Sequence, residues 1–160
     1  FYHFYGNANS YICSPGWYRT EARIIKNSVR SYAPDGLFWL VLDSNKKGRY
    51  PKAKHTAVHC YHYGWIRSEN EMNLKSEKVQ KYWSGKPVKI DYSQMDQSII
   101  KQFSGTHPAV VHDWLPRAEG VFEVDRKYTL TKKQKKHRIM LKLEKLFGLE
   151  LSKKHFKLVK

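Results

Sequence analysis

Cysteine is scarce in this chain, which has only Cys13 and Cys60. Two cysteines outside any Cys-x-x-Cys pair cannot supply the four ligands that structural zinc sites prefer, so we expect two reduced, packed thiols. Long hydrophobic runs are also missing, and none approaches the roughly 20 residues that cross a bilayer. No signal peptide is visible at the start of the sequence. These absences favour a cytoplasmic protein.

Common nucleotide-binding and metal-binding motifs are absent as well. The sequence has no Gly-x-Gly-x-x-Gly fingerprint and no Walker loop, so it does not support a dinucleotide or P-loop enzyme. It also lacks an Asp-x-Asp pair. The nearest carboxylates, Glu123 and Asp125, stand beside Arg126 and Lys127. A surface ion pair is the better interpretation of that stretch.

Positive charge and aromatic side chains are abundant. The formal net charge is +16, and residues 127–160 hold twelve Lys and Arg against Glu144 and Glu150. Such a field attracts polyanions, which include nucleic acid, anionic lipid and nucleoside diphosphates. A hydrophobic content of 41%, with five Trp, eleven Tyr and seven Phe, is too high for a disordered chain. We therefore expect a folded protein with an anionic partner.

Hydrophobic patterning and turn residues predict a mixed fold, either α/β or α+β. Ser68 and Glu71, and later Thr131 and Gln134, have the spacing of a capping box, which opens a helix. Gly148 is placed to end the second of these helices. The expected strands are residues 1–5, 17–26, 37–43 and 53–63, with 57–63 central in its sheet. The expected helices are residues 68–84, 92–103, 106–115 and 131–147.

Three histidines, His55, His59 and His62, would align on a helix and suggest a metal site. The surrounding residues indicate a strand instead, which sends His59 and His62 to opposite faces and disfavours three-histidine zinc. His62 stands where the predicted strand gives way to a loop, and strand ends are where open α/β sheets bind ligands. His62 is therefore either a ligand-binding residue or a core histidine bonded to a carbonyl.

A second set of candidates surrounds the arginines. Arg19, Glu21 and Arg23 share one face of the strand predicted over residues 17–26. Arg can bind a phosphate through two N–H groups, so this face is either a phosphate-binding site or a row of solvent-exposed charges along the strand. Asp35 lies in a Pro-Asp-Gly turn and is either an ordinary turn residue or a general base held on a loop.

The order of several short motifs resembles a bacterial branch of family 2 glycosyltransferases, over nearly the whole chain. They are His-Phe-Tyr-Gly at 3–6, Trp-Tyr-Arg at 17–19, Arg-Ile-Ile at 23–25, Tyr-His-Tyr-Gly-Trp at 61–65, Asp-Tyr-Ser at 91–93 and Gly-Thr-His-Pro-Ala-Val at 105–110.

This resemblance implies a GT-A fold, of which residues 1–118 would be the acceptor-side half and residues 119–160 a basic helical tail. An upstream half would hold Mg²⁺ or Mn²⁺ through an Asp-x-Asp-like motif, so we expect this part alone to be inactive. The implied reaction moves a sugar, with inversion, from a nucleoside-diphosphate donor to a glycan or lipid-linked acceptor. The implied roles are base for Asp35, donor-diphosphate contact for Arg23, Arg30 and His62, metal contact for His62, and acceptor stacking for Tyr63 and Trp65.

The basic tail leaves two interpretations open. The helix at 131–147 has one apolar face, formed by Ile139, Leu143, Leu146 and Phe147. This face fits attachment to the inner surface of an anionic membrane. The same helix could instead dock on the rest of the protein. The main rival to an enzyme is a basic nucleic-acid-binding module, which we disfavour because the aromatic residues do not accompany the lysine-rich tail.

Overall fold

A four-stranded sheet lies at the centre of the protein, whose computed structural model describes residues 1–34, 36, 38–83, 86–118 and 123–159. Its strands are β1 (Tyr2–Tyr5), β2 (Asn7–Ile12), β7 (Tyr61–Trp65) and β8 (Ile100–Gln102), in the order β7-β1-β2-β8. β1 runs parallel to β7 and antiparallel to β2, which in turn is antiparallel to β8. Gly6, at a φ of 72°, turns the chain between β1 and β2.

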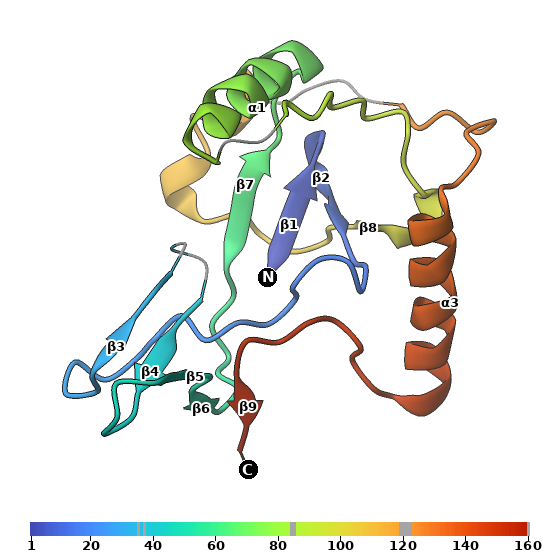
Figure 1. Cartoon of the computed structure of the whole chain (residues 1–160). Coiled ribbons are helices and arrows are strands. Elements are labelled where there is room, and N and C mark those ends of the chain that lie inside the picture. The colour runs from blue at the N-terminus through green and yellow to red at the C-terminus, as the bar shows by residue number, and fades with distance from the viewer. Residues whose placement is uncertain (35, 37, 84–85, 119–122, 160) are drawn as a thin grey trace.

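Two smaller sheets lie beside the central one (Figure 1). The first is antiparallel and contains β3 (Ser31–Tyr32), β4 (Leu40–Leu42) and β5 (Gly48–Arg49). The second pairs β6 (Lys52–Ala53) in parallel with β9 (Lys157–Leu158). The C-terminal segment therefore returns to lie beside residues 52–53.

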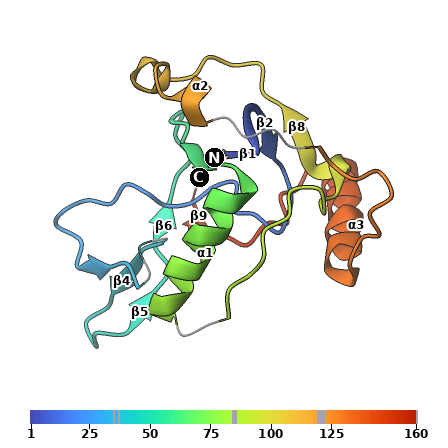
Figure 2. The ribbon, with the colours of Figure 1, turned by 90° about the horizontal axis from the view of Figure 1, so that it is seen from above.

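Helices flank the sheets. α1 (Glu69–Trp83) and α3 (Lys132–Phe147) lie well apart (Figure 2), although Met72 of α1 and Leu141 of α3 both pack in one core cluster. Between them in the chain are the short 3-10 turns Gln97–Ile99 and Ala109–Val111 and the four-residue α2 (Leu115–Ala118). None of the described helices is long and apolar enough to cross a membrane.

The starts of the helices predicted from Ser68 and Thr131, and the end of the second at Gly148, are confirmed. The Ser68 backbone N–H donates to Glu71 Oε2 at 3.0 Å, and the Glu71 N–H donates to Ser68 Oγ at 3.3 Å. Thr131 and Gln134 make the same reciprocal pair at the start of α3, and Gly148 caps its end at a φ of 64°. The mixed α and β fold class is confirmed too.

The described core residues around the central sheet form two clusters on its opposite faces, because successive side chains of β1 alternate between the faces. One cluster contains Tyr5, Ile12, Met72, Tyr92 and Ile99, with Trp17 and Trp65 packed against it. The other contains Phe4, Ala8, Ile66 and Leu115, with Tyr61 and Tyr63 packed against it.

Several predicted elements are wrong. Residues 17–26 form no strand, because their side chains bind the C-terminal segment instead of lining a sheet. Residues 92–103 form a turn, a 3-10 turn and β8 instead of a helix. The predicted strand 53–63 is irregular over residues 54–60, and β7 stands at an edge of its sheet.

The helix predicted before Pro116 is also misplaced. α2 begins at Leu115 and includes Pro116. A proline in the first turn of a helix costs little, because the backbone N–H that it lacks has no partner there in any case.

Candidate functional site

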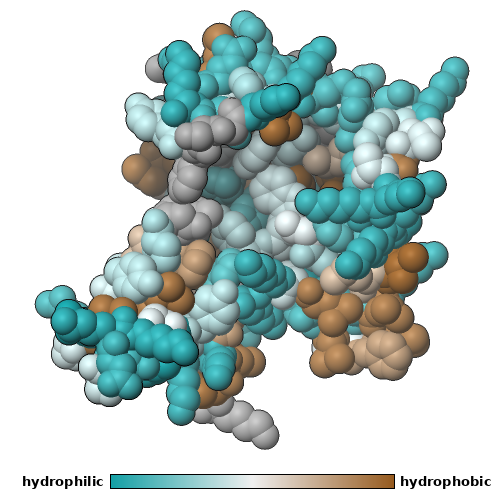
Figure 3. Space-filling model, viewed as in Figure 1, coloured by the Kyte–Doolittle hydropathy of each residue, from teal (hydrophilic) through white to brown (hydrophobic). Residues whose placement is uncertain are grey.

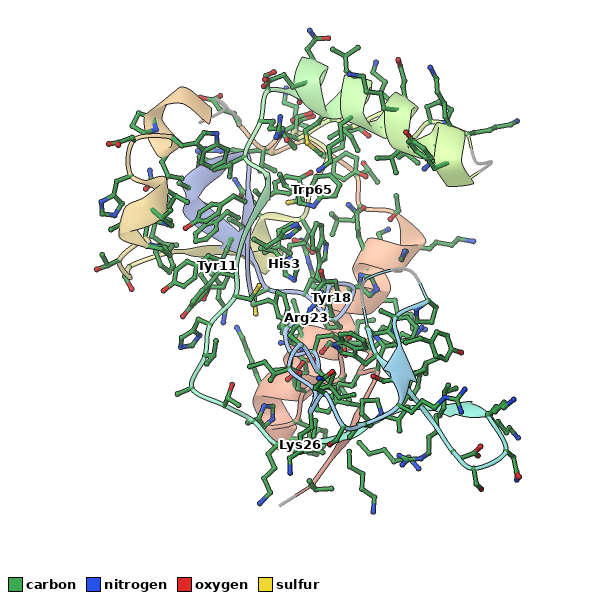
Figure 4. The ribbon with its side chains drawn as sticks, turned by 90° about the vertical axis from the view of Figure 1, so that its left-hand side faces the viewer. His3, Tyr11, Tyr18, Arg23, Lys26 and Trp65 are labelled. Atoms are coloured by element: carbon green, nitrogen blue, oxygen red, sulfur yellow. The ribbon has the colours of Figure 1, made fainter. Side chains whose placement is uncertain are left out.

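A cleft of about 690 Å³ opens between the loop at residues 19–26, the small sheets and the segment 52–60 that leads to β7. Arg23 and Lys26 follow one another along that loop, Tyr18 lies just before it, and His3 and Trp65 lie beyond them in the central sheet (Figure 4). Basic side chains dominate the polar lining: Arg19, Arg23, Lys26, Arg49, Lys52 and Lys54. Glu21 is the single acid among the lining residues that the structure describes.

Two of these ionic groups already have side-chain partners. Arg19 binds Glu144 through both terminal nitrogens, at 3.0 and 2.5 Å, and only 7% of the Glu144 side chain is exposed. Glu21, with a side chain 2% exposed, accepts a hydrogen bond from His155 Nδ1 at 2.7 Å. The other five cations form no salt bridge with any described residue. The cleft thus has a net positive charge that its own described acids do not cancel.

Arg23 is held at the cleft by aromatic rings and a carbonyl. Its guanidinium carbon lies 5.2 Å from the centre of the Phe1 ring and 5.8 Å from that of Tyr18. Its Nη1 donates to the Gly36 carbonyl at 3.3 Å. A guanidinium has five N–H groups, so this hydrogen bond leaves others that can bind an anion.

His62 is paired with a second histidine. His62 Nδ1 lies 2.9 Å from His3 Nδ1, and His3 Nε2 lies 2.7 Å from the Tyr18 carbonyl oxygen. Because a carbonyl only accepts, His3 carries its proton on Nε2 and accepts at Nδ1. The His62 proton is then on Nδ1, donated to His3. This arrangement leaves the lone pair on His62 Nε2, which makes no hydrogen bond to a described residue.

Both histidines are neutral near pH 7. Burial lowers the pKa of His3 to about 4, against a smaller opposing effect of the Tyr18 carbonyl. Burial also lowers the pKa of His62, and the positive charges of Lys75 and Arg23 lower it further. The His62 ring lies close over Gly64, since a Cβ there would come within 2.7 Å of His62 Nε2.

The predicted diphosphate residues are separated. Arg23 lines the cleft, whereas Arg30 is exposed immediately before β3 and is not among the lining residues. His62 lies within β7 instead of at its end, and it faces His3. Asp35, the predicted base, lies outside the described residues.

Tyr63 and Trp65 do not form a joint stacking surface. Tyr63 stacks on Phe4 at 5.0 Å and its hydroxyl bonds His107 Nδ1 at 2.9 Å. Trp65 packs with Tyr5 in the cluster on the other face. Simple alternation would put both residues on one face, but the β1–β7 register shifts between His3 and Tyr5.

The described residues do not fit a metal centre by themselves. Within the described ranges, no three His, Cys, Asp or Glu side chains gather as a metal site requires. His62 has one ring nitrogen engaged by His3, and no carboxylate of a described residue bonds the other. The expectation of Mg²⁺ or Mn²⁺, with His62 as a ligand, therefore stays a prediction.

Sequence reasoning missed most of the cleft. Arg49 lies just before the segment 52–60 that leads to β7, and Lys52 and Lys54 lie within it, but the three follow no known motif. Their convergence with Arg23 and Lys26 depends on the small sheets, which fold residues 40–53 toward the loop. A local excess of cations was the one signal present.

Comparisons with known proteins give no match to a family model, to a curated protein or to a solved structure. The resemblance to family 2 glycosyltransferases therefore stays a prediction based on short motifs. The geometry and charge of the cleft are the firmer ground for a function.

Proposed function

We propose that this chain is the acceptor-side part of an inverting glycosyltransferase, and that its cationic cleft binds the diphosphate of a nucleoside-diphosphate sugar. The observation that carries the proposal is the uncompensated positive lining of the cleft, with Arg23 fixed at its wall. A volume of about 690 Å³ suits a ligand of this size, since pockets for small ligands span roughly 300–1,000 Å³.

The cleft cations would act on the leaving group. Arg23 can offer paired N–H donors to phosphate oxygens, while Lys26 and Lys52 act as point charges. As the bond to the sugar breaks, negative charge grows on the diphosphate, and cations in place beforehand stabilise it. Asp35 remains the proposed base for the acceptor hydroxyl.

His62 fits a different role from the diphosphate contact that the resemblance implies. Its Nε2 carries a lone pair, and its depressed pKa keeps that atom unprotonated near pH 7. A lone pair repels phosphate oxygens but accepts a hydrogen bond from a hydroxyl. We therefore assign His62 to a hydroxyl contact outside the cleft, because neither His62 nor Trp65 is among the residues that line it.

Titration calorimetry of the 160-residue chain with UDP and GDP, in the presence of Mg²⁺, tests the proposal. We expect binding that weakens about tenfold or more in the Arg23→Ala variant, because a hydrogen bond to a charged group contributes about 1.5–3 kcal/mol. Arg67→Ala is the matched control, since Arg67 is exposed and does not line the cleft.

Two outcomes would contradict the proposal. The first is nucleotide binding that is equal in the wild type and Arg23→Ala. The second is no nucleotide binding together with salt-sensitive binding of single-stranded DNA, which would favour the nucleic-acid-binding alternative.

A further inference from the structure

Helix α3 is attached to the rest of the protein through one face. Glu144, at 8% exposure, binds Arg19 and also accepts from the Leu151 N–H at 2.7 Å. One helical turn and a half earlier, Arg138 binds the buried Asp96 through two nitrogens, at 3.0 and 2.6 Å. These two ion pairs fix which side of α3 faces inward.

The opposite face of α3 is apolar in its C-terminal half and remains open. Figure 3 shows hydrophobic side chains gathered at the C-terminal end of α3. The exposed fractions are 60% for Ile139, 41% for Leu143, 74% for Leu146, 64% for Phe147 and 62% for Leu149. We call these five residues the apolar patch. The sequence predicted the first four as one face of a helix, and the structure turns that face outward.

Lysines continue the same face toward the N-terminus of α3. Lys132, Lys135 and Lys136 precede Ile139 at the helical spacing of three, four and seven residues, and Lys142 flanks Leu143. All four lysines are exposed. The one acid of α3 is Glu144, which points inward. The outer face is therefore both apolar and cationic.

The lysines at the start of α3 destabilise the helix. Lys132, Lys133 and Lys135 crowd the first turn, which has no acid. The positive end of the helix dipole lies there and disfavours cations. An external anion would offset this repulsion.

We propose that the outer face of α3 binds an anionic membrane surface, with the helix lying in the plane of the headgroups. The apolar patch would enter the boundary of the acyl chains while the lysines contact lipid phosphates, as in interfacial amphipathic helices. A protein partner fits less well, because the buried centres of protein interfaces are depleted in lysine. This proposal stands on the surface of α3 and does not depend on the glycosyltransferase assignment.

Vesicle co-sedimentation of the 160-residue chain tests the proposal. We expect binding to vesicles of phosphatidylcholine mixed with phosphatidylglycerol, little binding to phosphatidylcholine alone, and loss at high salt. The double variant Leu146→Ser/Phe147→Ser should bind at least about tenfold more weakly. Val110→Ser is the matched control, because Val110 is 90% exposed and lies outside α3.

A second variant tests the cations. Lys135→Gln/Lys136→Gln/Lys142→Gln should weaken binding to the anionic vesicles by roughly a hundredfold, since each lysine near the surface contributes about fivefold. Circular dichroism identifies any variant that fails to fold. For such a variant, single substitutions at Leu146 and Lys142 replace the multiple ones.

Three results would overturn the proposal. One is undiminished vesicle binding by the Leu146→Ser/Phe147→Ser variant. Another is a dimer of the wild type in analytical ultracentrifugation that the same variant loses, with no vesicle binding, which would identify a second copy as the occupant. The last is binding of single-stranded DNA, but not vesicles, that needs the lysines and ignores the apolar patch.

Discussion

The Nδ1 atoms of His3 and His62 lie 2.9 Å apart across the parallel strands β1 and β7. His3 is 1% exposed, and its other nitrogen is bonded to the Tyr18 carbonyl. This geometry requires one proton on each ring, arranged in sequence from His62 through His3 to the carbonyl. A second proton on His3 would place two donors against each other.

We predict that this pair makes the protein sensitive to mild acid. The pKa of His3 falls to about 4 in the folded protein, whereas an unfolded histidine titrates near 6.5. Between these pH values the unfolded chain binds more protons, so the free energy of unfolding decreases as the pH falls. The expected loss from pH 7.5 to pH 4.5 is about 2 kcal/mol, measured by urea denaturation.

The His3→Gln variant should lose at least half of this pH dependence, because glutamine does not titrate. His55→Gln, at an exposed histidine, should keep it. An equal pH dependence in wild type and His3→Gln would assign the effect to other groups.

We predict that the Arg19→Met substitution lowers the free energy of unfolding by about 3 kcal/mol, because it leaves the buried carboxylate of Glu144 without its cationic partner. The double variant Arg19→Met/Glu144→Leu should regain most of the loss, since it removes both charges. Thermal and urea denaturation measure both effects.

Lys154 provides the comparison for Arg19. It pairs with Glu150 at 3.6 Å, and about a quarter of each side chain is exposed. Lys154→Met should cost less than about 1 kcal/mol, as expected of a solvent-accessible pair. Equal losses for Arg19→Met and Lys154→Met would show that burial of Glu144 does not govern the cost.

We predict that Gly148→Ala destabilises the protein by about 1 kcal/mol. Gly148 ends α3 at a φ of 64°, and no atom of the described residues, its chain neighbours apart, lies within 4 Å of the place where a Cβ would stand. The cost therefore comes from backbone strain alone. Gly148→Asn should cost less than Gly148→Ala, because asparagine tolerates the left-handed region better. The reverse order in thermal denaturation would rule out this explanation.

The parts of the fold that the sequence predicted are those set by neighbouring residues. Ser68 with Glu71, and Thr131 with Gln134, satisfy backbone N–H groups within one turn, so the starts of α1 and α3 could be predicted without tertiary information. Tyr2–Tyr5, within the strand predicted over residues 1–5, likewise has enough aromatic residues to favour a strand locally.

Residues 17–26 could not be predicted, because partners distant in the sequence determine their conformation. Arg19 binds Glu144 and Glu21 binds His155, across 125 and 134 residues of sequence. The alternating charges that suggested a strand face serve these long-range pairs instead. The same is true near Asp96, whose carboxylate caps a 3-10 turn and binds Arg138 where a helix was expected.

The candidate site was predicted in part. Arg23 was identified because Arg is the usual ligand for phosphate, and it lines the cleft. The pairing of His62 with His3 needed the β1–β7 register, which no local pattern reveals. The separation of Tyr63 from Trp65 follows from an irregularity in that same register.

The attachment of the loop 19–26 to the C-terminal segment affects how deletion experiments on this protein should be interpreted. A truncation before α3 would remove the carboxylate that holds Arg19 and the imidazole that holds Glu21. The cleft wall would lose its anchors although none of its own loop residues had been deleted. If removal of the tail abolishes ligand binding, the cause is therefore either the disrupted cleft wall or the loss of a contact between the tail and the ligand. Point substitutions at Arg23 are the sounder way to locate the ligand.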